Sequence, residues 1–282
     1  MKLLKLVSSV FLLLFVSCEQ VIDLDLPQPV PTLVVNALLV PGKAISVSVS
    51  SNIPALSNAA PPFISNATVL LYVDGYLRDS LAYNGTGEYT SMIGAEPGHM
   101  WRLDVSAPGY KSVSAVAQLP NPVKLSSARY GESISSPDVP GEMEQGMNIT
   151  FTDPPGPNYY GVQIFYGDSL QYQGDVWFRP RGTVFDTNEE PSDMAFFTDE
   201  RVEGKQVTLN LYTPPRSYYN GKPFIVVLRS LSADYYKFLE TKKTYNDTHD
   251  NPFAEPAPIY TNIQNGLGIM GAYSGASIVV RK

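Results

Sequence analysis

The stretch A-I-S-V-S-V-S, residues 44–50, alternates apolar and polar side chains without a break. Successive side chains on a β-strand point to opposite faces, so this pattern predicts a strand with Ile45, Val47 and Val49 facing a core. The run before it, T-L-V-V-N-A-L-L-V at residues 32–40, predicts an apolar strand that ends at the turn pair Pro41-Gly42. The body of the chain therefore opens with β structure.

Short strand-like segments separated by turn signals continue to about residue 120. Asp74-Gly75, Asn84-Gly85 and Pro108-Gly109 are turn pairs that favour hairpins and tight connections. The segments between them alternate apolar and polar residues, as in M-W-R-L-D-V-S-A at residues 100–107. Seven short strands at this spacing predict a β-sandwich domain over residues 32–120.

A second domain is predicted over residues 121–282, after the seam Pro120-Asn121-Pro122. One helix is expected at about residues 233–245, with Ser232 as its cap. Three glycines, Gly266, Gly268 and Gly271, are expected to force a tight backbone before a closing strand. The predicted fold class is all-β, with two β-sandwich domains and the helix inserted before the last strands. The strands expected in the second domain lie at 123–130, 147–153, 159–167, 207–213, 224–232 and 276–281, and residues 131–145 are expected to form a polar loop.

The first residues have the pattern of a bacterial lipoprotein signal. Lys2 and Lys5 precede an apolar run at residues 6–16, and small Ser17 precedes Cys18. The run is shorter than the roughly 20 apolar residues that cross a bilayer. Cys18 is the only cysteine among 282 residues, so it is not used for a disulfide within the chain. We predict a signal peptide over residues 1–17 and lipidation of Cys18. The alternative is an ordinary signal peptide that ends at a chance cysteine.

Residues 18–31 are predicted to form a tether between the lipid and the folded body. Pro27, Pro29 and Pro31 alternate with other residues, which favours an extended, semi-rigid spacer. Each methylene group of an acyl chain that is buried in the bilayer contributes about 0.8 kcal/mol to membrane binding, so two or three chains hold the protein at a membrane. Glu19, Asp23 and Asp25 resemble the acidic export signals of Bacteroidota surface lipoproteins, which implies the cell surface of the outer membrane rather than its periplasmic face.

The charge of the chain argues against nucleic-acid partners. The whole chain has 20 basic and 27 acidic residues, a net charge of −7, and removal of Lys2 and Lys5 with the signal peptide leaves 18 against 27, or −9. Phosphate backbones require clusters of basic residues, and anionic lipids attract them as well. We therefore expect no nucleic-acid ligand and a membrane contact made by the acyl chains alone.

No catalytic signature is present in the sequence, so we expect a non-enzymatic protein without a cofactor or metal. The two histidines lie outside metal-ligand spacings, and there is no G-x-S-x-G elbow or phosphate-binding loop. Two weaker alternatives stay open. Glu189 and Glu190 are candidates for a glycosidase carboxylate pair, although adjacent carboxylates in a loop are more often solvated. Asp247, His249, Asp250 and Glu255 could form a site for a hard cation such as calcium, and the other interpretation is a polar turn after the helix.

Aromatic residues crowd into the middle of the predicted second domain. Exposed aromatic faces stack on sugars or peptides, whereas buried ones fill the core of a β-sandwich, and both interpretations remain open for each residue. Trp177 is the best candidate for exposure, because arginines and a proline surround it. An aromatic-lined cleft would indicate a glycan or peptide ligand, and a flat apolar patch would indicate docking onto another protein. The candidate ligand-binding residues are Tyr159, Tyr160, Tyr172, Trp177, Phe178, Phe196, Phe197, Tyr218 and Tyr219.

The first domain resembles the transthyretin-like, carboxypeptidase-regulatory type of β-sandwich. The resemblance lies in N-A-T-V-L-L-Y-V-D-G at 66–75, T-G-E-Y-T-S at 86–91 and P-G-H-M-W-R-L-D-V-S-A-P-G-Y-K-S-V at 97–113. It implies a transthyretin- or Ig-like sandwich that serves as a spacer or interaction module and carries no catalytic residues.

The mature chain as a whole resembles a Bacteroidota lipoprotein family that is catalogued only as a domain of unknown function. The resemblance implies an outer-membrane lipoprotein, often encoded beside a TonB-dependent transporter of the starch-utilisation type, and hence an accessory role in nutrient uptake. A structural subunit that docks onto a transporter and a surface glycan-processing enzyme are the alternatives. The motifs that carry the resemblance are C-E-Q-V-I-D-L-D-L-P at 18–27, L-R-S-L-S at 228–232, D-Y-Y-K-F-L-E at 234–240, D-N-P-F-A-E-P at 250–256, Y-T-N-I at 260–263 and N-G-L-G-I-M-G-A-Y-S at 265–274.

Overall fold

The computed structural model confirms an all-β, sandwich-type fold with one α-helix among the described residues. Those residues are 29–54, 57, 59–168, 171–181, 184–185, 193–249, 255 and 257–280. The expected signal peptide, Cys18 and most of the tether lie outside them. Pro31–Lys282 forms one compact unit. No helix of the described part is long and apolar enough to cross a membrane.

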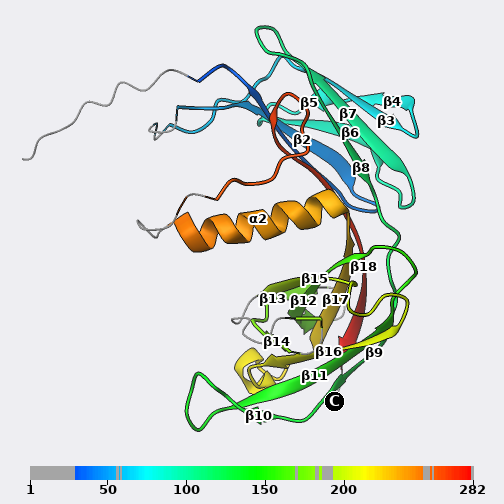
Figure 1. Cartoon of the computed structure of the whole chain (residues 1–282), viewed down its shortest axis with the longest axis vertical. Helices are drawn as coiled ribbons and strands as arrows, with labels where there is room; N and C mark the ends of the chain where they lie inside the picture. The colour runs from blue at the N-terminus through cyan, green and yellow to red at the C-terminus, as the bar shows by residue number, and fades with distance from the viewer. Residues whose placement is uncertain are drawn as a thin grey trace, which may run out of the picture. The chain divides into compact units, whose positions relative to one another are not determined.

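The first sandwich has two layers that enclose one hydrophobic core (Figure 1). Ile45, Val47 and Val49 are at most 1% exposed, which confirms the faces predicted from their alternation. One layer contains β1 (Leu33–Leu39), β2 (Ala44–Ser51), β6 (Glu88–Gly94) and β5 (Ala82–Tyr83), and the other contains β4 (Tyr76–Ser80), β3 (Thr68–Val73), β7 (Met100–Ser106) and β8 (Val113–Gln118).

The second sandwich encloses a separate, more aromatic core. Phe151, Tyr160 and Phe197 meet there, with ring centroids 5.1 to 6.4 Å apart. One layer contains β13 (Gln171–Asp175), β12 (Tyr159–Asp168), β15 (Met194–Thr198) and β17 (Phe224–Leu231). The other contains β9 (Leu125–Tyr130), β10 (Ile134–Ser135), β11 (Met143–Thr152), β16 (Gln206–Thr213) and β14 (Arg179–Arg181), and a 3-10 turn η1 (Arg216–Tyr219) follows β16.

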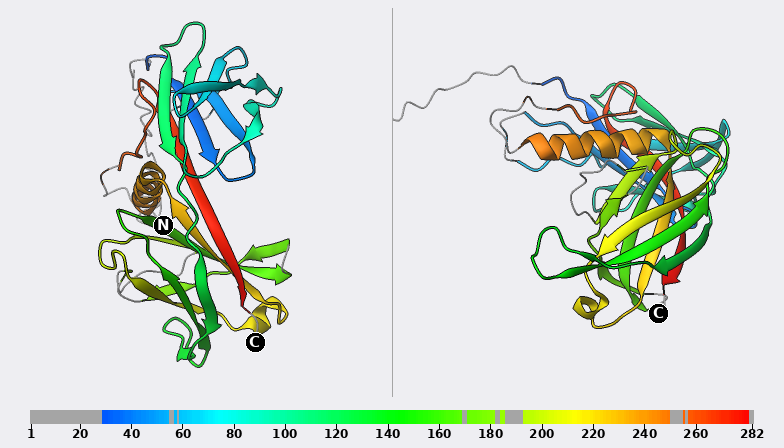
Figure 2. Two further views of the ribbon diagram at one scale, coloured as in Figure 1. Left: turned by 90° about the vertical axis from the view of Figure 1, so that its right-hand side faces the viewer. Right: turned by 60° about the horizontal axis from the view of Figure 1, so that its bottom comes forward.

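The last strand, β18 (Leu267–Val280), belongs to both sandwiches (Figure 2). Its first part runs parallel to β1, from Val34↔Leu267 to Leu39↔Ala272. Its second part runs antiparallel to β17, from Leu231↔Tyr273 to Phe224↔Val280. Layers of the two sandwiches are thereby joined into one nine-stranded sheet.

Two sequence expectations change as a result. The closing strand begins at Leu267 and not at Ala276, because Gly268 and Gly271 lie within it, and only Gly266 precedes it. Ile263, Met270 and Ala272, which the sequence assigned to the second domain, are packed in the first core. The linear division at residue 120 therefore does not describe where the C-terminal segment packs.

Glycines allow β18 to lie close to its neighbours. Gly268 has φ +103°, and a Cβ there would be 2.1 Å from the carbonyl oxygen of Val35. A Cβ at Gly271 would be 2.5 Å from the ring of Tyr235, on the helix. Any side chain at these positions would push β1 or the helix away from the strand.

The helix α2 (Ala233–His249) extends past the predicted end at residue 245. The Ser232 hydroxyl accepts hydrogen bonds from the backbone N–H of Tyr235 at 3.3 Å and of Ala272 at 3.2 Å. The cap expected from the sequence is thus present, and it also ties the helix to β18. The Asn262 carboxamide bonds both N–H and C=O of Met270, at 2.9 and 3.0 Å. These side chains satisfy the β18 backbone where it passes from one partner strand to the other.

We predict that Gly268→Ala destabilises the protein by at least about 2 kcal/mol more than Gly42→Ala, measured by urea unfolding. Both glycines have positive φ, so both variants carry the left-handed strain of an alanine. A Cβ at Gly42 meets nothing within 4 Å, so only Gly268→Ala also displaces β1. Equal losses in the two variants would show that the close approach of β18 to β1 does not limit stability.

Candidate functional site

Three of the nine candidate aromatic residues are core residues. Tyr160, Phe178 and Phe197 are 0%, 1% and 3% exposed. A side chain without exposed surface cannot stack on a ligand, so these three are removed from the candidate surface. They fill the second core, in keeping with the alternative weighed for each of them.

Three more candidates are half-buried and packed against other rings. Tyr159 and Phe196 both contact Tyr236 of α2, with ring centroids 5.1 and 5.7 Å apart. Tyr219 packs against Tyr166 at 4.9 Å and against a core phenylalanine. These rings attach the helix and η1 to the sandwich. Tyr172 is in β13, but its side chain lies outside the described ones.

Trp177 and Tyr218 are exposed and line the same cavity. Their exposed fractions are 58% and 60%, and the cavity has a volume of about 180 Å³. Exposure was expected for Trp177, and the structure brings Tyr218 beside it from a distant part of the chain. We call this cavity the Trp177 pocket, and its lining is Ser136, Asp138, Val139, Glu142, Met143, Glu144, Trp177, Phe178, Arg179, Tyr212, Pro214, Pro215 and Tyr218.

The pocket lies on the outer side of the five-stranded sheet. Tyr212 of β16 is paired in register with Arg179 of β14, while the neighbouring Leu211 is buried in the core. Trp177 precedes β14, and its neighbour Phe178 is also buried, so the local chain fixes Trp177 on the outside. Tyr218 comes from η1, where its N–H bonds the carbonyl oxygen of Pro215 at 3.0 Å.

The β10–β11 hairpin supplies the acidic wall of the pocket. Ile134 pairs with Glu144, and the turn between the strands carries Asp138 and Glu142. Arg179 forms an ion pair with Asp138, and its Nε lies 3.9 Å from Glu144 Oε2. A hydrogen bond to Glu142 raises the pKa of the Tyr218 hydroxyl. Three carboxylates and one guanidinium therefore give the lining a formal charge of −2.

Two polar atoms in this wall lack hydrogen bonds. Glu144 Oε2 and Arg179 Nε are buried and have no hydrogen-bond partner among the described residues. The other Glu144 oxygen accepts a hydrogen bond from the Ser136 hydroxyl at 3.1 Å. At 3.9 Å the ion pair is too long to be a hydrogen bond, so the negative charge of Glu144 is only partly compensated.

The sequence did not single out the charged members of the pocket. Residues 131–145 were expected to form a polar loop, but β10 and the start of β11 make a hairpin there. The turn contains Pro137, Pro140 and Gly141. Proline and glycine are uncommon inside strands, so the sequence did not predict the short strands on either side. The segment Pro140-Gly141-Glu142 between strand-like residues was the available signal for a hairpin.

A second cavity, of about 600 Å³, lies at the start of α2. It is lined by Tyr159, by the proline-rich segments around residues 120 and 155, and by Ser232 to Asp234. Met100 and Val116 add partly exposed apolar surface, at 44% and 42%. Tyr159 is the only candidate aromatic residue among the described ones that line this cavity.

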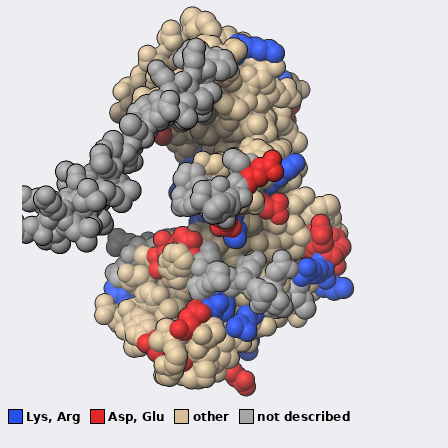
Figure 3. Space-filling model, turned by 60° about the vertical axis from the view of Figure 1, so that its left-hand side comes forward, with Lys and Arg blue, Asp and Glu red and all other residues tan. Residues whose placement is uncertain are grey.

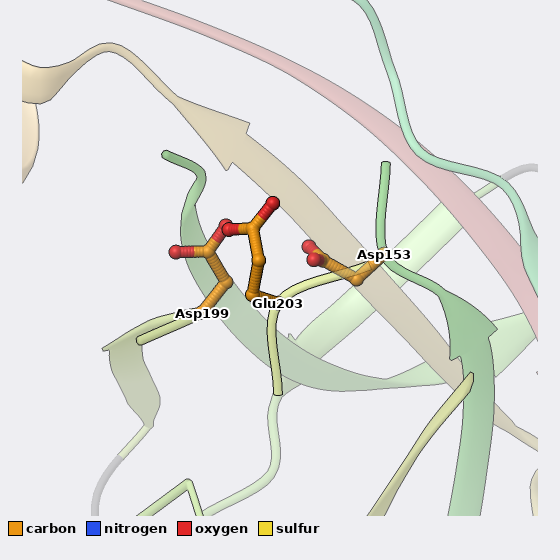
Figure 4. A group of neighbouring side chains, drawn as sticks. All are labelled: Asp153, Asp199 and Glu203. Atoms are coloured by element: carbon orange, nitrogen blue, oxygen red, sulfur yellow. The ribbon is translucent and has the colours of Figure 1, made fainter. Parts of the chain in front are cut away.

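Three carboxylates from two turns lie together in the second sandwich (Figure 4). The oxygen atoms of Asp153, Asp199 and Glu203 come within 4.8 Å of one another. Asp153 accepts hydrogen bonds from the Tyr160 hydroxyl at 2.5 Å and from the Gly204 N–H at 2.7 Å. Asp199 and Glu203 accept from the backbone N–H of residues 158 and 156. Carboxylate oxygens are suitable calcium ligands. In this cluster, however, they accept hydrogen bonds that join the two turns, which is a structural role.

The other ionisable groups considered from the sequence are dispersed. His99 Nδ1 lies 2.6 Å from the Asp74 carboxylate, and this hydrogen bond lowers the pKa of Asp74. Asp247 pairs with Lys243 at 3.0 Å, and His249 ends α2. Asp250, Glu189 and Glu190 lie outside the described residues. Figure 3 shows acidic and basic side chains intermixed on the face that it displays, which is typical of a solvated surface.

We predict that Tyr160→Phe lowers the free energy of unfolding at pH 7 by about 1–3 kcal/mol, because Asp153 loses a buried hydrogen-bond donor. Burial and this hydrogen bond raise the pKa of Tyr160 above its ordinary 10.0. The folded state then holds the proton more tightly than the unfolded state, so the stabilisation is complete below pH 10 and is lost as the pH rises further.

Urea unfolding between pH 7 and pH 11 checks both points. Stability should fall less steeply above pH 10 in Tyr160→Phe than in the unaltered protein. Tyr76→Phe is the control, since Tyr76 is 73% exposed and its loss should change stability by less than about 0.5 kcal/mol. A Tyr160→Phe protein as stable as this control would contradict the structural task of Asp153.

Comparison with known proteins gives one family and no annotated relative. No curated protein matches the chain. A family model described as a domain of unknown function, DUF4249, matches residues 19–278, which covers both sandwiches, the helix and nearly all of β18. The chain therefore belongs to the DUF4249 family.

Proposed function

We propose that this protein is a lipid-anchored, non-catalytic ligand-binding protein of the outer membrane, accessory to TonB-dependent nutrient uptake, with the Trp177 pocket as its ligand site. One observation carries the ligand site. Trp177 and Tyr218 are both more than half exposed and line one cavity together with charged side chains.

Exposed aromatic rings within a concavity are a common feature of ligand sites. A rigid ring offers a large contact area with few torsions to fix, so binding costs little conformational entropy. Met143 and Val139, at 48% and 44% exposure, extend the apolar surface at the pocket. The concave form favours a glycan or peptide ligand over flat docking onto a transporter.

The location rests on the sequence before residue 19. The charged start, short apolar run, Ser17 and Cys18 support acylation of the cysteine. The family match begins at Glu19, directly after the proposed lipid-bearing residue. The accessory role in uptake is supported by the resemblance of the motifs around residues 228–274 to lipoproteins encoded beside such transporters.

We predict that Cys18→Ala abolishes acylation and moves the protein out of the membrane fraction. Without the thiol, no diacylglycerol can be attached, and a signal-peptide run of this length does not span a bilayer. Cell fractionation and intact mass measurement of the purified chain check this result. Cys18→Ser, which keeps the size of the side chain, is the control and should behave like Cys18→Ala. A Cys18→Ala chain that remains acylated would overturn the anchor.

We predict that Trp177→Ala weakens ligand binding by about 30-fold (~2 kcal/mol), the loss expected when a central aromatic contact is removed. Calorimetric titration with a panel of glycans and peptides checks this, because the panel covers both ligand classes. Tyr76→Ala removes an exposed aromatic side chain from the first sandwich and is the matched control.

Two outcomes would contradict the proposed site. One is ligand binding that Trp177→Ala and Tyr76→Ala leave equally unchanged. The other is an absence of binding across the panel combined with co-isolation of a transporter that Trp177→Ala disrupts, which would identify the same surface as a docking site.

A further inference from the structure

We infer that the Trp177 pocket recognises an alkylammonium group, such as the side chain of a lysine in a peptide or a choline-type head group. This inference rests on the proposed ligand site and names the chemical class of its ligand. It combines three independent features of the pocket, which are its aromatic lining, its negative charge and its small volume.

The aromatic lining provides faces that attract cations. Trp177 and Tyr218 are exposed at the pocket, and the half-buried ring of Tyr212 is a third aromatic member of the lining. The π face of an aromatic ring is negative, and tryptophan is the strongest partner for an ammonium group. The same sheet already shows such a contact, since the Arg181 guanidinium lies 5.8 Å from the centre of the Tyr212 ring.

The charge of the lining has the sign that an ammonium group requires. Asp138, Glu142 and Glu144 outnumber the single cation Arg179, which is itself paired with Asp138. Glu142 is exposed, and one oxygen of Glu144 has no hydrogen-bond partner among the described residues. An arriving cation would be attracted by both, whereas an anionic ligand would be repelled and a neutral sugar would gain nothing from the charge.

The volume limits the part of the ligand that enters. About 180 Å³ is below the roughly 300–1,000 Å³ of cavities that enclose a whole drug-sized molecule. The pocket can therefore hold a head group or one side chain, while the rest of the ligand lies outside. A trimethylammonium group or the end of a lysine side chain fits this requirement, and several linked sugar rings do not.

The experiment compares ammonium probes with neutral molecules of the same shape. The pairs are choline with 3,3-dimethyl-1-butanol, and Nα-acetyl-lysine amide with Nα-acetyl-norleucine amide. NMR titration of the indole N–H signals gives a site-specific readout, because the chain has two tryptophans and the other, Trp101, is 2% exposed. The full mature chain is used, and neutral monosaccharides form a third arm.

We expect both ammonium probes to shift the Trp177 signal and to bind at least about tenfold more tightly than their neutral partners. The tighter of the two identifies the source of the group. Glu142→Gln and Glu144→Gln should each weaken ammonium binding several-fold, and Glu142 is exposed, so its variant tests charge without risk to folding. Glu96→Gln is the control, since Glu96 is 80% exposed in the first sandwich and carries the same charge.

The inference is overturned if the neutral partners bind as tightly as the ammonium probes, or if Glu142→Gln and Glu144→Gln leave binding unchanged. A monosaccharide that shifts the Trp177 signal more strongly than either ammonium probe would also overturn it, while the proposed ligand site would stand. If no probe shifts the Trp177 signal and the ligand panel binds independently of Trp177, both the inference and the proposed site fail.

Discussion

The described structure depends on one strand that pairs with two unrelated partners. The first part of β18 is parallel to β1 and the second part is antiparallel to β17, so the two cores are linked by continuous backbone hydrogen bonding. The change of partner would leave backbone groups unsatisfied at residues 270–272. Ser232 and Asn262 supply those bonds, and Ser232 caps α2 as well. The N-G-L-G-I-M-G-A-Y-S motif thus has a structural role, because its glycines leave room for the close approach of β1 and of the Tyr235 ring.

The Trp177 pocket lies away from this shared strand, on the outer layer of the second sandwich. Its base is rigid, because Phe178 and Leu211 are anchored in the core on the other side of the same sheet. The β10–β11 turn and η1 supply further side chains of the lining. In β-sandwich proteins, binding residues commonly lie on loops that a packed sheet holds in place.

The fold class could be predicted from the sequence because period-two alternation is a local property. Ile45, Val47 and Val49 show it, and all three are buried as expected. The pairing of β18 with β1 could not be predicted, since it joins residues more than 200 positions apart and its glycines are typical of a strand break.

Trp177 could be identified from its polar neighbours. The burial of Tyr160 and Phe197 could not be distinguished from exposure, because both faces of these strands carry aromatic residues. Glu144 and Arg179 meet only through sheet pairing, which no local pattern reveals.

The central functional claim is that the Trp177 pocket holds a ligand and is not a contact with another protein. The most direct test is photo-crosslinking in living cells from a benzoylphenylalanine placed at position 177, followed by mass spectrometry of the adducts. We expect adducts of ligand size, absent when the crosslinker is placed at position 76. A crosslink from position 177 to a transporter, with no ligand-sized adduct, would contradict the claim.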